Sequence, residues 1–256
     1  MILLRHGRTT ANASGTLAGW TPGIALDEVG REQAQAVGRR LAEAGIRPVR
    51  VVSSPLERCR ETADVVLRAL AADQGGDGHG IPVETDDGLG ECHYGAWTGR
   101  PLRELAAEPL WRVVQDHPSA ARFPDGEGDT AGMPGESIAQ MQARAVSALR
   151  RLDRAVEAAH GPRAVWLAVS HGDVVKSILA DAAGMHLDHF QRLVVDPASV
   201  SVVRYTHRRP FVLRLNDTGG TLAGIVPPEP PPEHAHGDAA DGDAAVGGGA
   251  GSSGAG

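Results

Sequence analysis

Short runs of β-branched and apolar residues alternate along the chain with longer stretches in which apolar residues recur at helical spacing. The short runs predict strands at residues 1–5, 49–53, 81–85, 164–170, 194–205 and 211–215. Apolar positions three, four or seven residues apart predict helices at 27–44, 63–70, 138–156 and 174–183. Asp27 is a suitable N-cap for the first helix, whose pattern stops at Gly45.

This alternation is typical of parallel strands joined by crossover helices. It predicts an α/β fold, a three-layer sandwich in which a mostly parallel central sheet carries helices on both faces. The run at 164–170 is apolar until its last residue, as expected for a strand buried on both faces, so we place it at the centre of the sheet. The last two predicted strands are interpreted as a hairpin at the sheet edge.

Residues 1–225 contain no internal repeat and are interpreted as one catalytic domain. Within it, residues 88–135 are irregular, rich in proline and carry Trp97 and Trp111. We expect this segment to be a partly helical insertion that covers the end of the sheet.

Residues 226–256 differ sharply in composition from the rest of the chain. They consist mainly of Pro, Glu, Gly, Ala, Asp and Ser, and Val246 is the only large apolar residue after Val226. Such a segment cannot offset its ordering entropy by burial, so we expect a disordered tail. His234 and His236 are expected to be solvated there rather than to bind a metal.

The amino-acid composition and net charge limit which kinds of partner and which location we expect for this protein. The 256 residues are 41% hydrophobic, which is enough for a sizeable core, and the net charge of −7 argues against a nucleic-acid or membrane-surface partner. No leader and no apolar stretch of membrane-spanning length is apparent, so we expect a cytoplasmic enzyme. Cys59 and Cys92 lack the spacing of a disulfide framework or a zinc site and are interpreted as free thiols.

Three polar clusters follow predicted strands: Arg5-His6-Gly7, residues 53–58 ending in Arg58, and Ser170-His171-Gly172. In open parallel sheets, ligands bind beyond the carboxyl ends of the strands, so these clusters should converge on one pocket. Two arginines and two histidines suit a dianion, because guanidinium groups clamp phosphate oxygens bidentately. The sequence therefore predicts a phosphate site.

The same residues carry a resemblance to a known family. Leu4-Arg5-His6-Gly7 with Thr9, Asn12 and Gly19-Trp20, then residues 54–58, Leu89-Gly90-Glu91 with residues 95–99, and Ser170-His171-Gly172 resemble the motifs of the histidine phosphatase superfamily, which includes the phosphoglycerate mutases. The resemblance spans residues 1–215. It implies a phosphoglycerate mutase-like fold and catalysis through a phosphohistidine.

The resemblance also implies roles for the catalytic residues. His6 would be the nucleophile, and its imidazole must be neutral to attack phosphorus. Arg5, Arg58 and His171 would hold the phosphoryl oxygens and stabilise the charge of the transition state. Glu91 would protonate the leaving alkoxide and then take a proton from the attacking water.

Four further residues are expected to contact the substrate. Thr9 and Asn12 would donate hydrogen bonds to phosphate, Gly19 belongs to the same motif, and the backbone of Gly172 can approach the phosphate closely. No metal or other cofactor is expected, because arginines supply the positive charge. For the acid, Glu57, Glu104 and Glu136 remain as alternatives to Glu91.

The sequence favours a metal-independent acid phosphatase-type hydrolase acting on a small phosphorylated substrate. The alternative is a 2,3-bisphosphoglycerate-dependent phosphoglycerate mutase, and His93-Tyr94-Gly95 is mutase-like. However, Cys92 stands where the mutases carry an arginine, and residues 134–137 resemble the phosphatase branches. A second alternative is a phosphoryl-binding regulatory protein without turnover. A homodimer is possible through the exposed edge strands.

Overall fold

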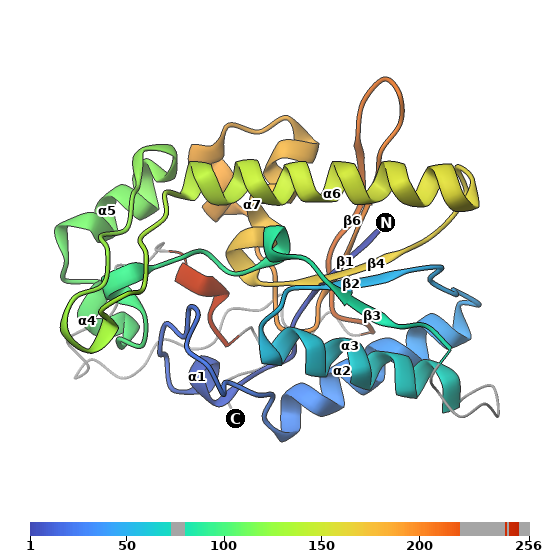
Figure 1. Cartoon of the computed structure of the whole chain (residues 1–256), viewed down its shortest axis with the longest axis horizontal. Coiled ribbons are helices and arrows are strands. Elements are labelled where there is room, and N and C mark those ends of the chain that lie inside the picture. The colour runs from blue at the N-terminus through green and yellow to red at the C-terminus, as the bar shows by residue number, and fades with distance from the viewer. Residues whose placement is uncertain (73–79, 221–243, 245, 251–256) are drawn as a thin grey trace.

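A six-stranded sheet organises the chain, with strand order β3-β2-β4-β1-β5-β6 (Figure 1). The computed structural model describes residues 1–72, 80–220, 244 and 246–250. Strands β1 (Ile2–Arg5), β2 (Val51–Ser53), β3 (Val83–Thr85) and β4 (Leu167–Ser170) run parallel to one another. The predicted α/β fold with a mostly parallel sheet is confirmed, and β4 lies at its centre between β2 and β1.

The last two strands form the predicted edge hairpin. Strand β5 (Val200–Arg204) pairs antiparallel with β1, and β6 (Phe211–Asp217) pairs antiparallel with β5. The strand expected from residue 194 begins only at Val200, because Ala198 has a φ of +55° that takes the chain out of the extended conformation.

Helices cover both faces of the sheet, as predicted (Figure 1). Helices α2 (Glu28–Glu43) and α3 (Glu57–Ala72) lie on one face, and α6 (Ile138–His160) and α7 (Gly172–Ala183) lie on the other. The predicted N-cap of α2 is confirmed, since the Asp27 side chain accepts a hydrogen bond from the amide of Gly30. Helix α6 begins with a capping box formed by Ser137 and Gln140.

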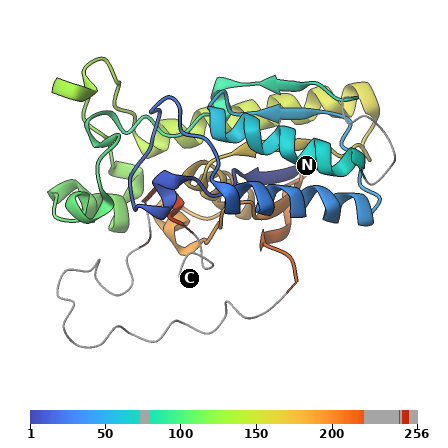
Figure 2. The same ribbon diagram turned by 90° about the horizontal axis from the view of Figure 1, so that it is seen from below.

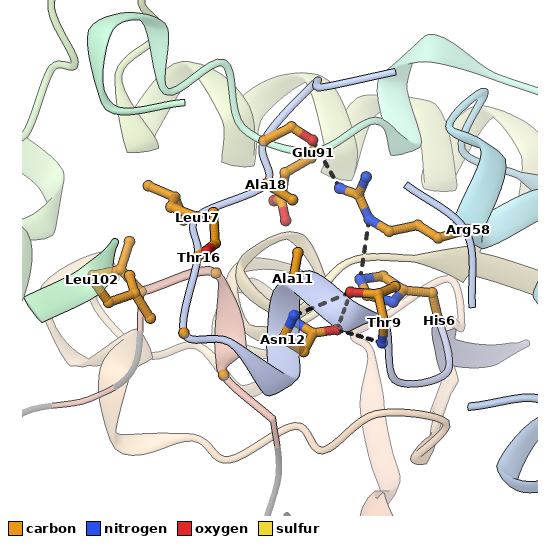
Figure 3. Close-up of a pocket in the computed structure, with 15 residues that line it drawn as sticks. His6, Thr9, Ala11, Asn12, Thr16, Leu17, Ala18, Arg58, Glu91 and Leu102 are labelled. Atoms are coloured by element: carbon orange, nitrogen blue, oxygen red, sulfur yellow. Dashed lines mark hydrogen bonds between the residues drawn. The ribbon is translucent and has the colours of Figure 1, made fainter. Parts of the chain in front are cut away.

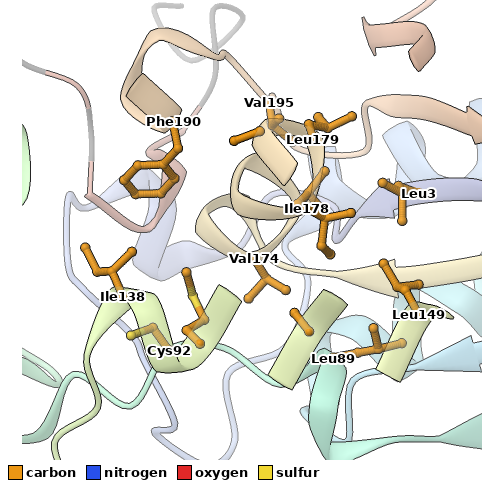
Figure 4. Close-up of a cluster of buried hydrophobic side chains, with 14 of the residues drawn as sticks. Leu3, Leu89, Cys92, Ile138, Leu149, Val174, Ile178, Leu179, Phe190 and Val195 are labelled. Carbon is orange, nitrogen blue, oxygen red and sulfur yellow. The ribbon is translucent and has the colours of Figure 1, made fainter. Parts of the chain in front are cut away.

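Alternation along β1 divides the core into two clusters. Leu3 points to the side of α6 and α7, whereas Ile2 and Leu4 point to the side of α2 and α3. Figure 4 shows the first cluster, where Leu3, Leu149 and Ile178 pack together. Both faces of β1 and β4 are therefore buried, so the strands are packed from both sides.

The segment between β3 and α6 contains two short helices, α4 (Leu102–Leu105) and α5 (Pro109–Asp116), and several 3-10 turns. Its aromatic residues extend the cluster that contains Leu3; the ring centroids of Trp97 and Phe123 are 5.3 Å apart and those of Trp97 and Trp111 are 6.2 Å apart. In Figure 1 this segment lies beyond the end of the sheet, where the insertion was expected.

Two regions differ from the sequence expectation. Helix α1 (Thr10–Ala13) was not predicted, because one turn is too short for an amphipathic pattern; a capping box of Thr9 and Asn12 stabilises it. The tail expected to be disordered falls mostly outside the described residues, as do His234 and His236. Its part at Val246–Gly248 forms a 3-10 turn in which Val246 is buried.

Helix α2 touches the loop that follows β1 at a point where no side chain fits. A Cβ atom at Gly30 would lie 2.0 Å from the carbonyl oxygen of Arg8. At an exposed helix position, replacing glycine by alanine usually stabilises the protein by about 1 kcal/mol. At Gly30 the close contact should make the same replacement destabilising. We expect Gly30→Ala to destabilise the protein by about 1–3 kcal/mol, as measured by chemical unfolding. Gln35→Ala, at an exposed position of the same helix, is the control; equal stability of both variants would contradict this packing.

Candidate active site

The polar clusters converge at the carboxyl ends of the parallel strands. His6 follows β1, Arg58 lies in the first turn of α3 after β2, and His171 is the N-cap of α7 after β4. Glu91 reaches the same place from the loop after the 3-10 turn Asp87–Leu89. His6, Arg58, Glu91 and His171 are all buried, each with at most 3% of its surface exposed. Figure 3 shows His6, Arg58 and Glu91 around one pocket.

Hydrogen bonds define the tautomer of His6. Its Nδ1 lies 2.8 Å from the carbonyl oxygen of Gly7. A carbonyl can only accept, so Nδ1 carries the proton and Nε2 keeps its lone pair. The Nε of Arg58 donates to that Nε2 at 3.3 Å, which shows that the lone pair faces the guanidinium side of the pocket.

The surroundings keep the imidazole of His6 neutral. Burial lowers the pKa of His6 well below its usual value, and the charges of Arg58 and Arg5 lower it further. A neutral ring with an unprotonated Nε2 is the form required of a nitrogen nucleophile.

His171 is fixed by two partners. Arg58 Nη2, which can only donate, lies 3.1 Å from Nδ1, so the proton of the neutral ring is on Nε2 and is donated to the Ser54 hydroxyl at 2.8 Å. Burial, followed by the charge of Arg58, lowers the pKa of His171 well below its usual value. The two histidine rings are 5.3 Å apart between centroids.

Glu91 is a buried carboxyl with few hydrogen bonds. Its Oε1 accepts from the amide of Cys92 at 2.9 Å, and its Oε2 lies 3.7 Å from Nδ1 of His171. Burial, and then the negative charge of Asp173, raises the pKa of Glu91 to about 7. The carboxyl can therefore both give and take a proton near neutral pH.

The alternative acids lie elsewhere. Glu57 and Glu104 are exposed, and Glu136 forms an ion pair with Arg144 at 2.7 Å. Glu91 is the only carboxylate among the described residues that line the pocket. This placement favours Glu91 as the acid.

Arg5 is fully buried, and its guanidinium group donates hydrogen bonds to backbone carbonyls. Its Nη1 donates to the carbonyls of Val195 at 2.7 Å and Gly248 at 2.5 Å, and its Nη2 donates to that of Gly249 at 2.6 Å. Burial lowers the pKa of Arg5 to about 10, so the group remains cationic at neutral pH.

The four residues expected to contact substrate all lie at or beside this pocket. Thr9, Asn12 and Gly19 line it, but the Thr9 hydroxyl donates to Oδ1 of Asn12 at 2.9 Å within the capping box (Figure 3). The carbonyl of Gly19 accepts from Arg58 Nη2 at 2.9 Å. Gly172 starts α7, and a Cβ there would lie 3.4 Å from Nε of Arg5.

Sequence reasoning missed several contacts that support the site. Ser54 and Trp20 lie within the family motifs, but the contact of Ser54 with His171 and that of Trp20 with Glu91 depend on the fold. The Cys59 thiol lies 3.4 Å from Nε2 of His171, and burial raises its pKa to about 12. Trp20 donates from Nε1 to the carbonyl of Glu91 at 2.7 Å. Asp173, next to Gly172 in the sequence, accepts from the Tyr94 hydroxyl at 2.8 Å.

Three further expectations concern metal binding, membrane spans and the cysteines. Among the described residues, no group of three or more His, Cys, Asp or Glu side chains is arranged to hold a metal ion. Within the same residues, no helix has the length and apolar character needed to cross a membrane. Cys59 and Cys92 are both free thiols, as predicted.

The sequence profile of the histidine phosphatase superfamily (branch 1) matches residues 1–218. The chain belongs to this superfamily. This histidine phosphatase superfamily member is 31% identical over 233 residues to a 2,3-bisphosphoglycerate-dependent phosphoglycerate mutase of Thermobifida fusca (strain YX), covering 85% of this chain and 87% of the mutase.

Two solved structures resemble this superfamily member. The mycobacterial glucosyl-3-phosphoglycerate phosphatase in complex with VO3 matches with a TM-score of 0.68 at 26% identity, covering 85% of this chain and 98% of that one. The phosphoserine phosphatase of Entamoeba histolytica in complex with 3-phosphoglyceric acid has a TM-score of 0.68 at 23% identity, covering 84% and 95% respectively. The second match shows the fold alone.

The raised pKa of Glu91 has a consequence for stability in this superfamily member. The unfolded carboxyl ionises near its usual pKa of 4.5, whereas the folded one holds its proton up to about 7, so stability is lost as pH rises between these values. Glu91→Gln removes this loss. We expect the Tm difference between the variant and wild type to grow in favour of the variant from pH 5 to pH 8, measured by calorimetry.

Two features make this measurement specific. The histidines lose stability on acidification in both proteins, so their effect cancels in the difference. Glu57→Gln, at an exposed position, should leave the Tm difference flat with pH. A flat difference for Glu91→Gln as well would contradict the raised pKa.

Proposed function

We propose that this superfamily member is a phosphomonoester hydrolase that passes the phosphoryl group through a covalent intermediate on Nε2 of His6. The observation that carries the proposal is the pairing of a neutral His6, whose Nε2 is unprotonated, with a Glu91 that can be protonated near neutral pH, in the same pocket. A nucleophile and a proton donor in their required states are the minimum for this reaction.

In the first half of the reaction, Nε2 of His6 attacks phosphorus and the P–O bond to the leaving alcohol breaks. Arg58 already donates to Nε2 in the resting site, so its guanidinium is within reach of the phosphoryl oxygens. In this proposal His171, which lies beside Arg58, and Arg5, once released from its carbonyl partners, share this charge. Their stabilisation grows as negative charge spreads over the oxygens in the transition state.

In this proposal Glu91 acts in both halves of the reaction. As the acid it gives its proton to the departing alkoxide, and as the resulting carboxylate it takes a proton from the water that attacks the phosphohistidine. The cycle therefore returns Glu91 to its protonated form and His6 to its neutral form, with inorganic phosphate and the alcohol as products.

Hydrolysis is favoured over the mutase reaction by the charge around the pocket. Among the described residues, Arg58 is the only arginine or lysine that lines it, and both Arg58 and the neighbouring Arg5 are assigned to the phosphoryl group, so no further arginine or lysine lines it to bind a substrate carboxylate. Cys92, at the position where the mutases carry an arginine, is buried against the core near Ile138 (Figure 4). Arg100, downstream of it, is paired with Glu108 at 2.5 Å.

The first test is turnover of p-nitrophenyl phosphate in the presence of EDTA between pH 5 and 8. We expect p-nitrophenol release, because arginines rather than a metal supply the positive charge. No release would favour the alternative of a phosphoryl-binding protein. Formation of 2-phosphoglycerate from 3-phosphoglycerate and 2,3-bisphosphoglycerate would instead establish the mutase reaction.

The division of roles predicts opposite labelling of two variants. His6→Ala should abolish the acid-labile phosphoenzyme, whereas Glu91→Ala should let it accumulate from p-nitrophenyl phosphate, whose leaving group needs no proton. Rapid quench with ³²P-labelled substrate measures both. Glu104→Ala, which changes an exposed acid, is the control and should label like wild type. Equal labelling of the His6 and Glu91 variants would exclude the assigned roles.

The pKa of Glu91 also predicts a pH profile. For an alkyl phosphate such as glycerol 2-phosphate, kcat/KM should fall about tenfold per pH unit above pH 7 as Glu91 loses its proton. The fall should be weaker for p-nitrophenyl phosphate. Because the pKa of His6 is well below its usual value, no loss is expected between pH 7 and 6. An alkyl phosphate profile that rises above pH 7 would be incompatible with Glu91 as the acid.

A further inference from the structure

A segment from the far end of the chain lies in the mouth of the catalytic pocket. Val246–Gly248 forms a 3-10 turn, and Val246, Gly247 and Gly249 line the pocket together with His6 and Arg58. Figures 1 and 2 both show this turn in red beside the blue helix α1. We call the described residues of this segment, Ala244 and Val246–Ala250, the tail plug.

The tail plug binds the guanidinium group of Arg5. The carbonyl oxygens of Gly248 and Gly249 accept from Nη1 and Nη2 at 2.5 and 2.6 Å. Two oxygens in front of two Nη atoms are also the arrangement in which arginine binds a phosphate. The plug and a phosphoryl group therefore compete for the same donors.

Further contacts fix the tail plug on either side of Arg5. The amide of Gly247 donates to Oδ2 of Asp173 at 2.9 Å. On α5, the side-chain amide of Gln115 forms two hydrogen bonds with the backbone of Ala244, at 2.8 and 2.9 Å. Val246 is buried, with only 1% of its surface exposed. Contacts with three separate elements favour one bound position.

The glycines of the plug are required by the close approach. Gly247, Gly248 and Gly249 have φ values of +72°, +80° and +51°, which side chains disfavour. A Cβ at Gly248 would lie 2.9 Å from Nη1 of Arg5. A glycine run that would otherwise be interpreted as linker sequence therefore has the shape that this pocket accepts.

With the plug in place, the donors that a phosphoryl group would use are taken. The carbonyls of Gly248 and Gly249 occupy Nη1 and Nη2 of Arg5. Val246, Gly247 and Gly249 also line the pocket beside His6, where the remaining cavity measures about 20 Å³. The plug must withdraw before a phosphoester can place its oxygens against Arg5.

We infer that the tail plug is an autoinhibitory element that competes with the phosphoryl group for Arg5. This inference rests on the proposed function, because it takes the pocket to be a phosphoester site. A plug bound for most of the time raises the apparent KM by the reciprocal of the open fraction, and it leaves kcat unchanged because saturating substrate displaces it.

Gly248→Ala in the full-length chain tests the inference by weakening the plug outside the catalytic residues. We expect its KM for p-nitrophenyl phosphate to fall about five- to tenfold with kcat unchanged, as for a plug bound about 80–90% of the time. Gly220→Ala is the matched control, because Gly220 also has a positive φ, +99°, but no atom lies within 4 Å of the added Cβ. Gln115→Ala, which removes the contact on α5, should lower KM to a smaller extent.

An unchanged KM in Gly248→Ala would overturn the inference while leaving the proposed function intact. A lowered kcat would overturn it too, because the segment would then assist the reaction rather than block it.

Hydrogen exchange provides a readout that does not need turnover. In wild type, the amides of residues 247–249 should be protected, and orthovanadate should release them, whereas in Gly248→Ala they should exchange quickly from the start. If no phosphoester is hydrolysed but vanadate releases these amides, the proposed function fails and the plug stands. If vanadate leaves their protection unchanged, the plug is not competing for the phosphate site and the inference is wrong.

Discussion

The guanidinium group of Arg58 connects the parts of this site that lie far apart in the sequence. Its Nε donates to His6 and its Nη2 faces His171, while the same Nη2 also donates to the carbonyl of Gly19. Two strand ends, a helix and the loop after α1 thus meet at one cation. Since a guanidinium cannot accept, it also determines which nitrogen of each imidazole is unprotonated. The tautomer of His6 is set by this one contact together with the carbonyl of Gly7.

This arrangement is held at some cost in stability. Arg5, Arg58 and Glu91 are buried, and burying charged groups is unfavourable unless partners compensate. The two hydrophobic clusters on either side of β1 and β4 are what allows it, because they fix the strand ends from which His6 and His171 project. Burial in turn gives the site its chemistry, since desolvation is the largest cause of the shifted pKa values of His6, His171 and Glu91.

The sequence predicted the sheet, its central strand and its edge hairpin because strands buried on both faces have a strong apolar pattern. It predicted that His6, Arg58 and His171 would meet because parallel strands bring their carboxyl ends to one edge. It could not predict contacts that depend on side-chain packing, such as Ser54 on His171 or Cys59 beside it. Nor could composition show that glycines 247–249 approach Arg5, since a glycine-rich segment has no hydrophobic pattern and its fit depends on the pocket.

The proposed nucleophile, His6, and the proposed acid, Glu91, belong to different kinds of structure. His6 and His171 directly follow strands of the sheet, whereas Glu91 belongs to the long irregular segment between β3 and α6, which also contributes Leu102 to the pocket lining. Under the proposed reaction, substitutions or insertions in that segment would alter which alcohol is accepted without displacing the residues that follow β1 and β4. The choice of leaving group would then be separate from the binding of the phosphoryl group, so one scaffold would be open to many phosphoesters.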